Sequence, residues 1–244
     1  SSRNDLLNRL RGQVVELPDL KPVFAHWPQA VSPHKEELDT VVENKMIKLF
    51  PPGERLQKMQ KGEMALFGAA WWPYAPLSEL TIVTHFSTWA TKLFVWDDEI
   101  DSSEYSNLIK DLDKASLYRR QTVNYIHACL FGDPDSRNRS VHPIIAHFKP
   151  IGDALRVVFD YEQLYSFYQE LVHYVDSTQV EQKYQIDGNI PSVEEYMTRR
   201  MGSSAVRPSL VLTEYGYNMR LPRHLMDNKN MCAVWDATNV IISV

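Results

Sequence analysis

Residues 76–101 read PLSELTIVTHFSTWATKLFVWDDEID, and this stretch decides between fold classes. Apolar residues recur every three to four positions, beginning at Leu77 and Leu80 and ending at Phe94. This spacing places one apolar stripe along a helix, whereas a half-buried strand would alternate apolar and polar residues. The stretch therefore predicts a long helix that ends in a cluster of carboxylates.

The rest of the chain has the same character. No alternating strand pattern persists, and glycine is scarce, with nine in 244 residues. A second clear helix is predicted over 32–50, and proline clusters mark the ends of helices. We expect the first ten residues, which are polar, to be disordered. The pattern predicts a single all-α domain over residues 1–244, with roughly eight to ten helices joined by short loops.

Composition excludes several classes of protein. A formal net charge of −5 argues against a nucleic-acid-binding protein, which would carry a basic patch. The longest apolar run, MALFGAAWW, has nine residues and is too short to cross a membrane, so we expect no membrane partner. Cys129 and Cys232 do not have the spacing of metal ligands. We interpret them as reduced thiols of a cytoplasmic protein.

The carboxylate cluster is the first candidate site. If 76–101 is one helix, Asp97 and Asp101 project from one face, with Phe94 one turn earlier and Ala90 and Phe86 continuing that face. Two carboxylates at a helix C-terminus repel each other and oppose the helix dipole. A solvated acidic helix end is the simple alternative. The apolar approach instead favours a site for a hard divalent cation, Mg²⁺ above all.

The second candidate site is YMTRRMGSSAVRP, residues 196–208. Ser192 and Glu195 have the spacing of a capping box, so a helix is predicted to begin near Ser192. Two arginines follow in mid-helix, and an arginine fork suits phosphate oxygens. The Gly-Ser-Ser run would break the helix and expose backbone carbonyls. A surface arginine pair at an ordinary helix end is the alternative.

These two segments resemble the motifs of class I terpene synthases. DDEID resembles the DDxxD motif, which implies that Asp97, Asp98 and Asp101 hold Mg²⁺ ions that bridge to a diphosphate. Residues 196–208 are similar to the pyrophosphate-sensor region YxxxRRxTxG, in which Tyr196 matches the tyrosine. The resemblance implies that Arg200 is the sensor, Ser203 the linker and Ser204 the effector. The chain departs from the pattern at Gly202 and at Ser204.

The resemblance extends along most of the chain. Residues 17–38, LPDLKPVFAHWPQAVSPHKEEL, resemble the opening of fungal sesquiterpene cyclases. Membership would imply a helical bundle around a central cavity. It would also imply Mg²⁺-dependent ionisation and cyclisation of a linear prenyl diphosphate, farnesyl diphosphate above all, to a sesquiterpene hydrocarbon or alcohol. Three Mg²⁺ ions are expected in the complete enzyme, with Mn²⁺ as an alternative. Whether the protein forms a homodimer is left open.

Aromatic side chains beside the motif are candidates for the substrate cavity, because aromatic faces stabilise positive charge without acting as nucleophiles. Each has core packing as its alternative, and for Asn239 the alternative is a core-facing helical asparagine. The candidate cavity residues are Phe94, Ala90, Phe86, Phe67, Trp71, Trp72, Tyr174 and Asn239.

The family also carries a second metal motif, NDxxSxxxE, on a late helix. Its spacing from Arg200 would place it just past Val244, so we expect that the chain is a fragment and that it cannot assemble three metals alone. Two rival functions stay open. A prenyl-chain elongating transferase would be expected to carry a second DDxxD, whereas VWDAT (234–238) has one acid. A non-catalytic helical metal-binding or interaction domain would lack an aromatic cavity beside Asp97.

Overall fold

The computed structural model describes residues 3–90, 96, 99–100, 106, 108–188 and 190–243. The predicted motif residues Asp97, Asp98 and Asp101 lie outside this set, as does Phe94. Every regular element in the described ranges is helical, which confirms the prediction of an all-α fold.

The helices, in chain order, are α1 (Arg3–Leu10), α2 (Lys35–Leu49), α3 (Glu54–Gln60), α4 (Met64–Trp71), α5 (Leu77–Ala90), the 3-10 turn η1 (Leu108–Lys110), α7 (Leu112–Phe131), α8 (Pro134–Arg137), α9 (Pro143–Ala146), α10 (Lys149–Val158), α11 (Tyr161–Asp187), α12 (Val193–Ser203), α13 (Val206–Gly216), α14 (Arg223–Met226) and α15 (Lys229–Ser243).

The long predicted helices are present. Helix α2 lies within the predicted 32–50. Helix α5 covers Leu77–Ala90 of the predicted 76–101, and most of the rest of that stretch lies outside the described residues. The structure differs in having additional short helices, since α8, α9 and α14 have four residues each. Two of these begin with proline, whose fixed φ suits the first helical turn. The expectation of disorder at the N-terminus is wrong, because residues Arg3–Leu10 form α1.

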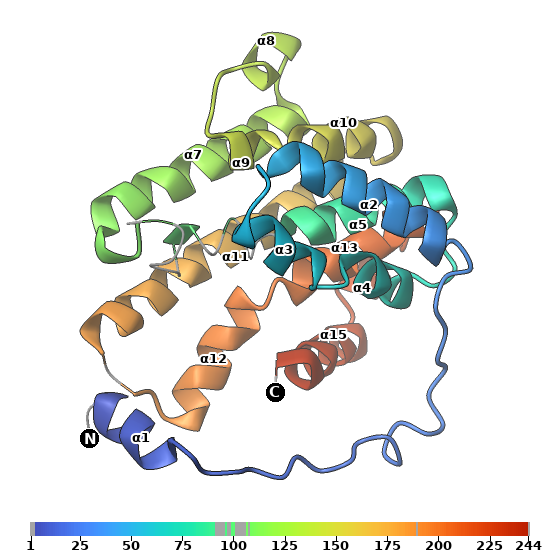
Figure 1. Cartoon of the computed structure of the whole chain (residues 1–244). Coiled ribbons are helices and arrows are strands. Elements are labelled where there is room, and N and C mark those ends of the chain that lie inside the picture. The colour runs from blue at the N-terminus through green and yellow to red at the C-terminus, as the bar shows by residue number, and fades with distance from the viewer. Residues whose placement is uncertain are drawn as a thin grey trace.

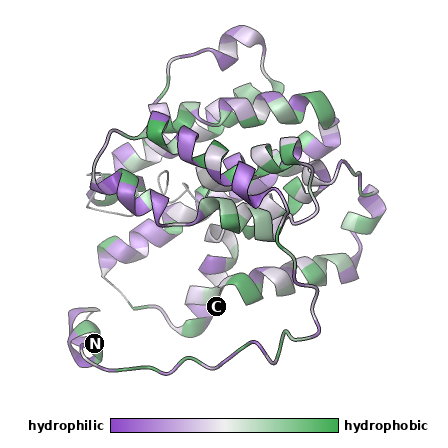
Figure 2. Ribbon diagram, turned by 45° about the vertical axis from the view of Figure 1, so that its right-hand side comes forward, coloured by the Kyte–Doolittle hydropathy of each residue, from purple (hydrophilic) through white to green (hydrophobic). Residues whose placement is uncertain are grey.

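Helix α11 is the centre of the bundle. It has 27 residues and packs against α7, α12 and α13 (Figure 1). Helices α4 and α5 pack together, α2 packs on both, and α5 also contacts α10 and α13. The helix ribbons change between hydrophilic and hydrophobic colour along their length (Figure 2), as expected of helices that bury one face. Helix α15 packs on α12 and α13, and α13 joins them to α5.

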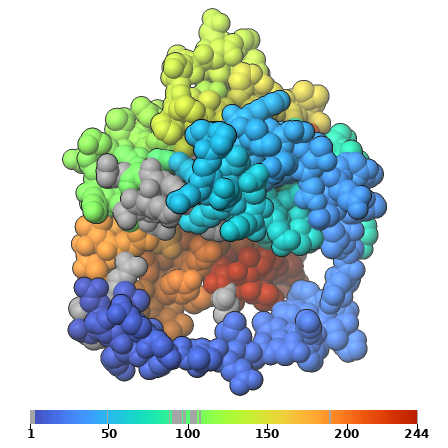
Figure 3. Space-filling model, viewed as in Figure 1, coloured from blue at the N-terminus to red at the C-terminus, as the bar shows by residue number. Residues whose placement is uncertain are grey.

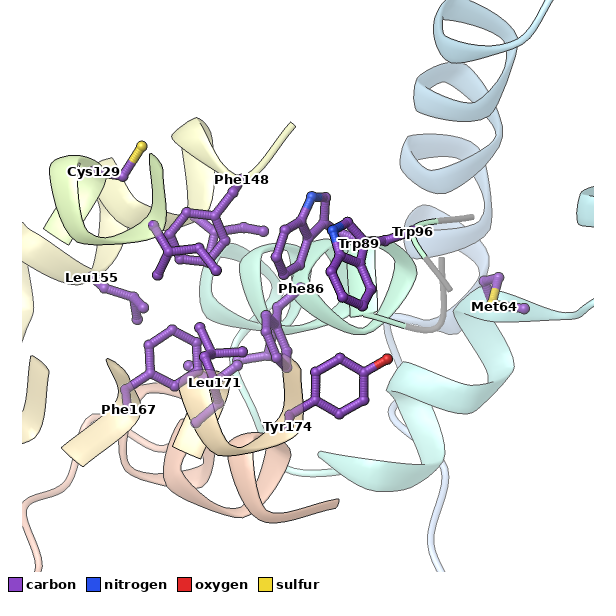
Figure 4. Close-up of a cluster of buried hydrophobic side chains, with 14 of the residues drawn as sticks. Met64, Phe86, Trp89, Trp96, Cys129, Phe148, Leu155, Phe167, Leu171 and Tyr174 are labelled. Atoms are coloured by element: carbon purple, nitrogen blue, oxygen red, sulfur yellow. The ribbon is translucent and has the colours of Figure 1, made fainter. Parts of the chain in front are cut away.

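The core is aromatic where α5 meets α10 and α11. The Phe86 ring lies 5.3 Å from the Phe167 ring, and Trp89 lies 4.9 Å from Phe148 (Figure 4). The indole N–H of Trp89 donates to the carbonyl oxygen of Ile144 at 3.0 Å, which satisfies its polar atom. Truncating such a buried ring to alanine costs about 3–5 kcal/mol of stability, so this cluster holds the bundle rigid around its other sites.

The segment between α1 and α2 packs little against the bundle. Its apolar residues are exposed, with Val14 at 96% and Leu17 at 82% of their full accessibility. The segment runs below α12 and α15 and stands off them (Figures 1 and 3). In the described part of the chain, no helix is long and apolar enough to cross a membrane.

Candidate active site

The junction between α12 and α13 is a break in the helical path. Helix α12 begins with the predicted capping box, in which Ser192 and Glu195 each bond the other's backbone N–H. The helix ends at Ser203, and Ala205 takes a left-handed conformation with φ 57° before α13 begins at Val206. A non-glycine residue costs about 1–3 kcal/mol in this region of backbone space. Strain of this kind often marks a functional site, and the sequence predicted a break here.

Arg200 lies on the last turn of α12, beside this break. Its Nη1 donates to the carbonyl oxygen of Ser203 at 3.4 Å, a carbonyl that has no partner within a helix that ends there. The guanidinium is partly buried and contributes to the wall of a cavity. The break and the arginine therefore act as one unit of the wall.

The cavity has a volume of about 300 Å³ and lies between α4, α5, the α12–α13 junction and α15. Phe67 and Trp71 of α4 form its aromatic side, with ring centroids 5.3 Å apart. Arg200 and Ser204 contribute polar groups from the junction. The other lining residues are Gly62, Met64, Ser87, Ala205, Val206, Ser209 and Ile242. One cavity therefore joins a cationic fork to aromatic faces.

The described residues beside the acidic motif are anchored in the bundle. Trp96 is fully buried, stacks on Tyr118 at 5.7 Å and donates from Nε1 to Thr122 Oγ1 at 2.7 Å. Glu99, 9% exposed, pairs with Arg55 of α3 at 3.0 Å. Burial, and then the nearby Glu99 carboxylate, raise the pKa of Tyr118 above its ordinary value. Glu99, within the motif, is thus tied to α3, and Trp96, just before it, to α7.

A metal centre would depend on the aspartates themselves. Within the described ranges, no three His, Cys, Asp or Glu side chains are grouped as a metal site requires. The metal assignment to Asp97, Asp98 and Asp101 therefore stays a prediction.

Comparison with known proteins decides the family. Residues 88–244 match the family model described as "Terpene synthase family 2, C-terminal metal binding". The chain belongs to the terpene synthase family. Sesquiterpene cyclase hepA of Aspergillus oryzae is 33% identical over 99% of this chain and 66% of its own length. Terpene cyclase braA of Annulohypoxylon truncatum is 24% identical over 94% of this chain and 60% of its own.

The chain spans less than two thirds of these relatives' length. Solved structures of terpene synthases have the same fold as this chain. The structure of hedycaryol synthase in complex with nerolidol superposes with a TM-score of 0.73 at 18% identity, covering 94% of this chain and 70% of that one. An ancestrally reconstructed protein, SVS_A2, gives a TM-score of 0.76 at 14% identity, with coverage of 88% and 64%. The helical isoprenoid-synthase bundle is therefore the fold of this terpene synthase.

Four of the predicted site residues meet at the cavity. Phe67, Trp71, Arg200 and Ser204 come from two segments more than 120 positions apart in the terpene synthase chain. Ser203 contributes its carbonyl oxygen to Arg200, whereas its buried hydroxyl has no hydrogen-bond partner among the described residues. Their catalytic roles stay predictions.

Other candidates lie elsewhere in the terpene synthase. Phe86 is fully buried between Trp89 and Phe167, and Tyr174 packs on Trp96 at 5.9 Å. Trp72 is fully buried, 5.9 Å from the Trp71 ring. These three rings are not among the residues that line the 300 Å³ cavity. The side chain of Ala90, at the end of α5, and Phe94 fall outside what the structure describes.

Asn239 does not line the aromatic cavity either. It is fully buried in α15 and borders a separate polar cavity of about 360 Å³, together with Glu170, His173 and Arg207. Its side chain bonds Met201 and Ser204 at the α12–α13 junction, which confirms the alternative of a core-facing helical asparagine.

Sequence reasoning missed several lining residues of this terpene synthase, notably Met64, Ser87, Ser209 and Ile242. Met64 could have been found, because Met64, Phe67 and Trp71 share one helical face at spacings of three and four. The two serines have no comparable signal, since a serine within an apolar helix is compatible with core packing or a cavity.

Proposed function

We propose that the full-length protein ionises and cyclises a linear prenyl diphosphate, farnesyl diphosphate above all, to a sesquiterpene hydrocarbon or alcohol and releases diphosphate. The observation that carries the proposal is the single cavity in which Arg200 and the helix break face Phe67 and Trp71. Similarity to a protein named sesquiterpene cyclase supports the choice of farnesyl diphosphate. A diphosphate and a hydrocarbon chain would each find matching chemistry there.

Arg200 would bind the diphosphate oxygens. Its planar fork offers parallel N–H donors, and its hydrogen bond to Ser203 O aims it from the helix break. As the allylic C–O bond breaks, both electrons stay with the diphosphate oxygen, and Arg200 stabilises the charge that develops there. Groups that are fixed before the reaction need not reorganise during it, so the clamped break lowers the barrier.

Phe67 and Trp71 would face the carbocation that remains. Aromatic faces attract a cation within about 6 Å of the ring centroid and offer it no nucleophile. Met64, Val206 and Ile242 add apolar surface beside them, which would limit the access of water to the cation. The cation would then close a carbon–carbon bond and end by losing a proton or by adding a water molecule.

The metal cofactor belongs to this proposal. Asp97, Asp98 and Asp101 offer only carboxylate oxygens, the donors that Mg²⁺ prefers and that Mn²⁺ also accepts. Bound Mg²⁺, three ions in the complete enzyme, would neutralise charge on the departing diphosphate. The two free cysteines, Cys129 and Cys232, are consistent with a cytoplasmic location.

The elongating transferase is the weaker alternative. It would need a second acidic motif, and the single acid of VWDAT, Asp236, is exposed and paired with Arg207 at 3.1 Å. A carboxylate held on the outer surface of α15 by an arginine is poorly placed to bind metal inside the bundle.

Incubation of the full-length protein with geranyl, farnesyl or geranylgeranyl diphosphate and Mg²⁺ tests the function. We expect cyclic fifteen-carbon volatiles from farnesyl diphosphate by gas chromatography–mass spectrometry, and their loss with EDTA. Longer linear diphosphates, formed when isopentenyl diphosphate is added, would support the transferase instead. Absence of any turnover would contradict both enzymes.

A further inference from the structure

Asn239 connects α15 to the end of α12 and to Ser204 in the helix break. Its Nδ2 donates to the carbonyl oxygen of Met201 at 2.7 Å. Its Oδ1 accepts from Ser204 Oγ at 2.7 Å and from Ser243 Oγ at 3.2 Å. The asparagine is 0% exposed, so these bonds are formed away from water and their geometry is constrained by close packing.

The bonded groups are those that a broken helix leaves without partners. Met201 is in the last turn of α12, where backbone carbonyl oxygens have no N–H partner within the helix. Ser204 Oγ also accepts from the N–H of Val206, the first residue of α13, at 3.3 Å. One chain of hydrogen bonds therefore runs from the end of α12 through Asn239 and Ser204 to the start of α13.

This network lies behind the cavity wall. Arg200, Ser204, Ala205 and Val206 line the 300 Å³ cavity, whereas Asn239 borders the polar cavity on the other side of the junction. Ala205 takes a left-handed backbone conformation that is unfavourable for alanine. The contacts around it must therefore hold it in this conformation. Asn239 bonds Met201 and Ser204, which both precede Ala205, and Ser204 in turn accepts from the N–H of Val206 beyond it.

We propose that Asn239 is a positioning residue, which holds the α12–α13 break in the conformation in which Arg200, bonded to the Ser203 carbonyl oxygen, lines the cavity. The proposal rests on the proposed function for its catalytic consequence. The clamp itself depends only on the hydrogen bonds, and it can be tested without turnover. An amide suits the position because it donates to a carbonyl and accepts from two hydroxyls at once.

Two substitutions of Asn239 distinguish the bond of its amide nitrogen from those of its amide oxygen. Asn239→Ala removes all three bonds. Asn239→Asp keeps an acceptor for the serines but turns an acceptor oxygen toward Met201 O, so the bond to α12 is lost. Thr238→Ala is the matched control, because Thr238 bonds only Val234 O of its own helix at 2.8 Å among the described contacts. If the Asn239 variants fold poorly, Ser204→Ala is a milder test, because it removes only the bonds of the Ser204 hydroxyl. Ser204→Thr keeps a hydroxyl and should restore the wild-type behaviour.

Hydrogen–deuterium exchange on the full-length protein tests the clamp. Amides of residues 202–206 should exchange at least about tenfold faster in Asn239→Ala and in Asn239→Asp, and at the wild-type rate in Thr238→Ala. Faster exchange across the whole protein would indicate general destabilisation and would overturn the proposal, as would unchanged exchange at the junction.

Kinetics with farnesyl diphosphate, well below the melting temperature, test the consequence. We expect kcat to fall about tenfold or more, with KM within about threefold, because the clamp orients groups that act in the transition state. Unchanged kcat in a variant with a loosened junction would overturn the positioning role. An inactive wild type would overturn the proposed function instead, and the exchange at 202–206 would still decide the clamp.

Discussion

The guanidinium of Arg55 lies 3.0 Å from the carboxylate of Glu99, the middle residue of the acidic motif DDEID. Arg55 also lies over the Phe50 ring, 5.3 Å from its centroid. The pair therefore ties Glu99 to α3, while Trp96, just before the motif, bonds Thr122 of α7. Two helices thus hold the segment that carries the predicted metal ligands.

Arg55→Ala should destabilise the fold by about 1–3 kcal/mol, because it leaves the buried Glu99 carboxylate without this charge partner. Urea unfolding measures the change. Arg223→Ala is the control, since Arg223 and Asp227 form a pair in which both side chains are more than half exposed. Its effect should stay below about 1 kcal/mol. Equal effects of the two variants would contradict the anchoring role of Arg55.

Arg200→Lys should lower kcat/KM on farnesyl diphosphate by about 10²-fold, because lysine keeps the charge but lacks the planar fork. The neighbouring arginine provides the control. The Arg199 guanidinium lies 4.2 Å from the Tyr184 ring centroid and is not among the residues that line the 300 Å³ cavity. Arg199→Ala should therefore change kcat/KM by less than about threefold. Steady-state kinetics that show the larger loss at Arg199 would reverse the assignment of the sensor.

Gly202→Ala should cost about 1–3 kcal/mol, because α12 crosses α11 too closely for a methyl group. A Cβ at this position would lie 2.7 Å from the Ser177 Cβ and 3.3 Å from His173 Nε2. This contact explains why glycine stands where the family pattern has threonine. Thermal or urea unfolding of Gly202→Ala, with and without Ser177→Gly, measures the coupling. Strictly additive effects of the two changes would show that the two positions do not touch.

The two cysteines should react very differently. Burial raises the pKa of the Cys129 thiol to about 11, so at pH 8 it stays protonated and shielded, whereas Cys232 is exposed. Ellman's reagent should titrate one thiol rapidly in the folded chain and two in guanidinium chloride. Cys232→Ser should abolish the rapid reaction. Rapid modification of two thiols in the folded protein would contradict the burial of Cys129.

Local signals in the sequence predicted the helices well. The capping box of Ser192 and Glu195 and the spacing within α2 and α5 depend on residues a few positions apart. The break after Ser203 was predictable for the same reason, because Gly-Ser-Ser weakens a helix regardless of its neighbours. The residue that takes the left-handed conformation, Ala205, was not predicted, since alanine has no preference for it.

Which side chains face the cavity depends on tertiary packing, and the sequence predicted only some of them, such as Phe67 and Arg200. Helix α5 is buried on several sides, with Val83, Thr84, His85, Phe86 and Ser87 all buried. Its periodicity therefore cannot show that Ser87 faces the cavity while Phe86 enters the core. Asn239 is 35 positions from Ser204, so their hydrogen bond has no signature in either segment.

The central claim is a site that takes diphosphate together with Mg²⁺. Its most direct test is a thermal-shift titration of the full-length protein with MgCl₂, inorganic diphosphate, or both, on wild type and on Asp97→Asn. At a hundredfold excess over the dissociation constant, a ligand that binds the folded state adds about 2.7 kcal/mol of stability. We predict a clear rise in melting temperature only with the two together, and only in the wild type. Stabilisation by Mg²⁺ alone, or an equal response in Asp97→Asn, would contradict the account.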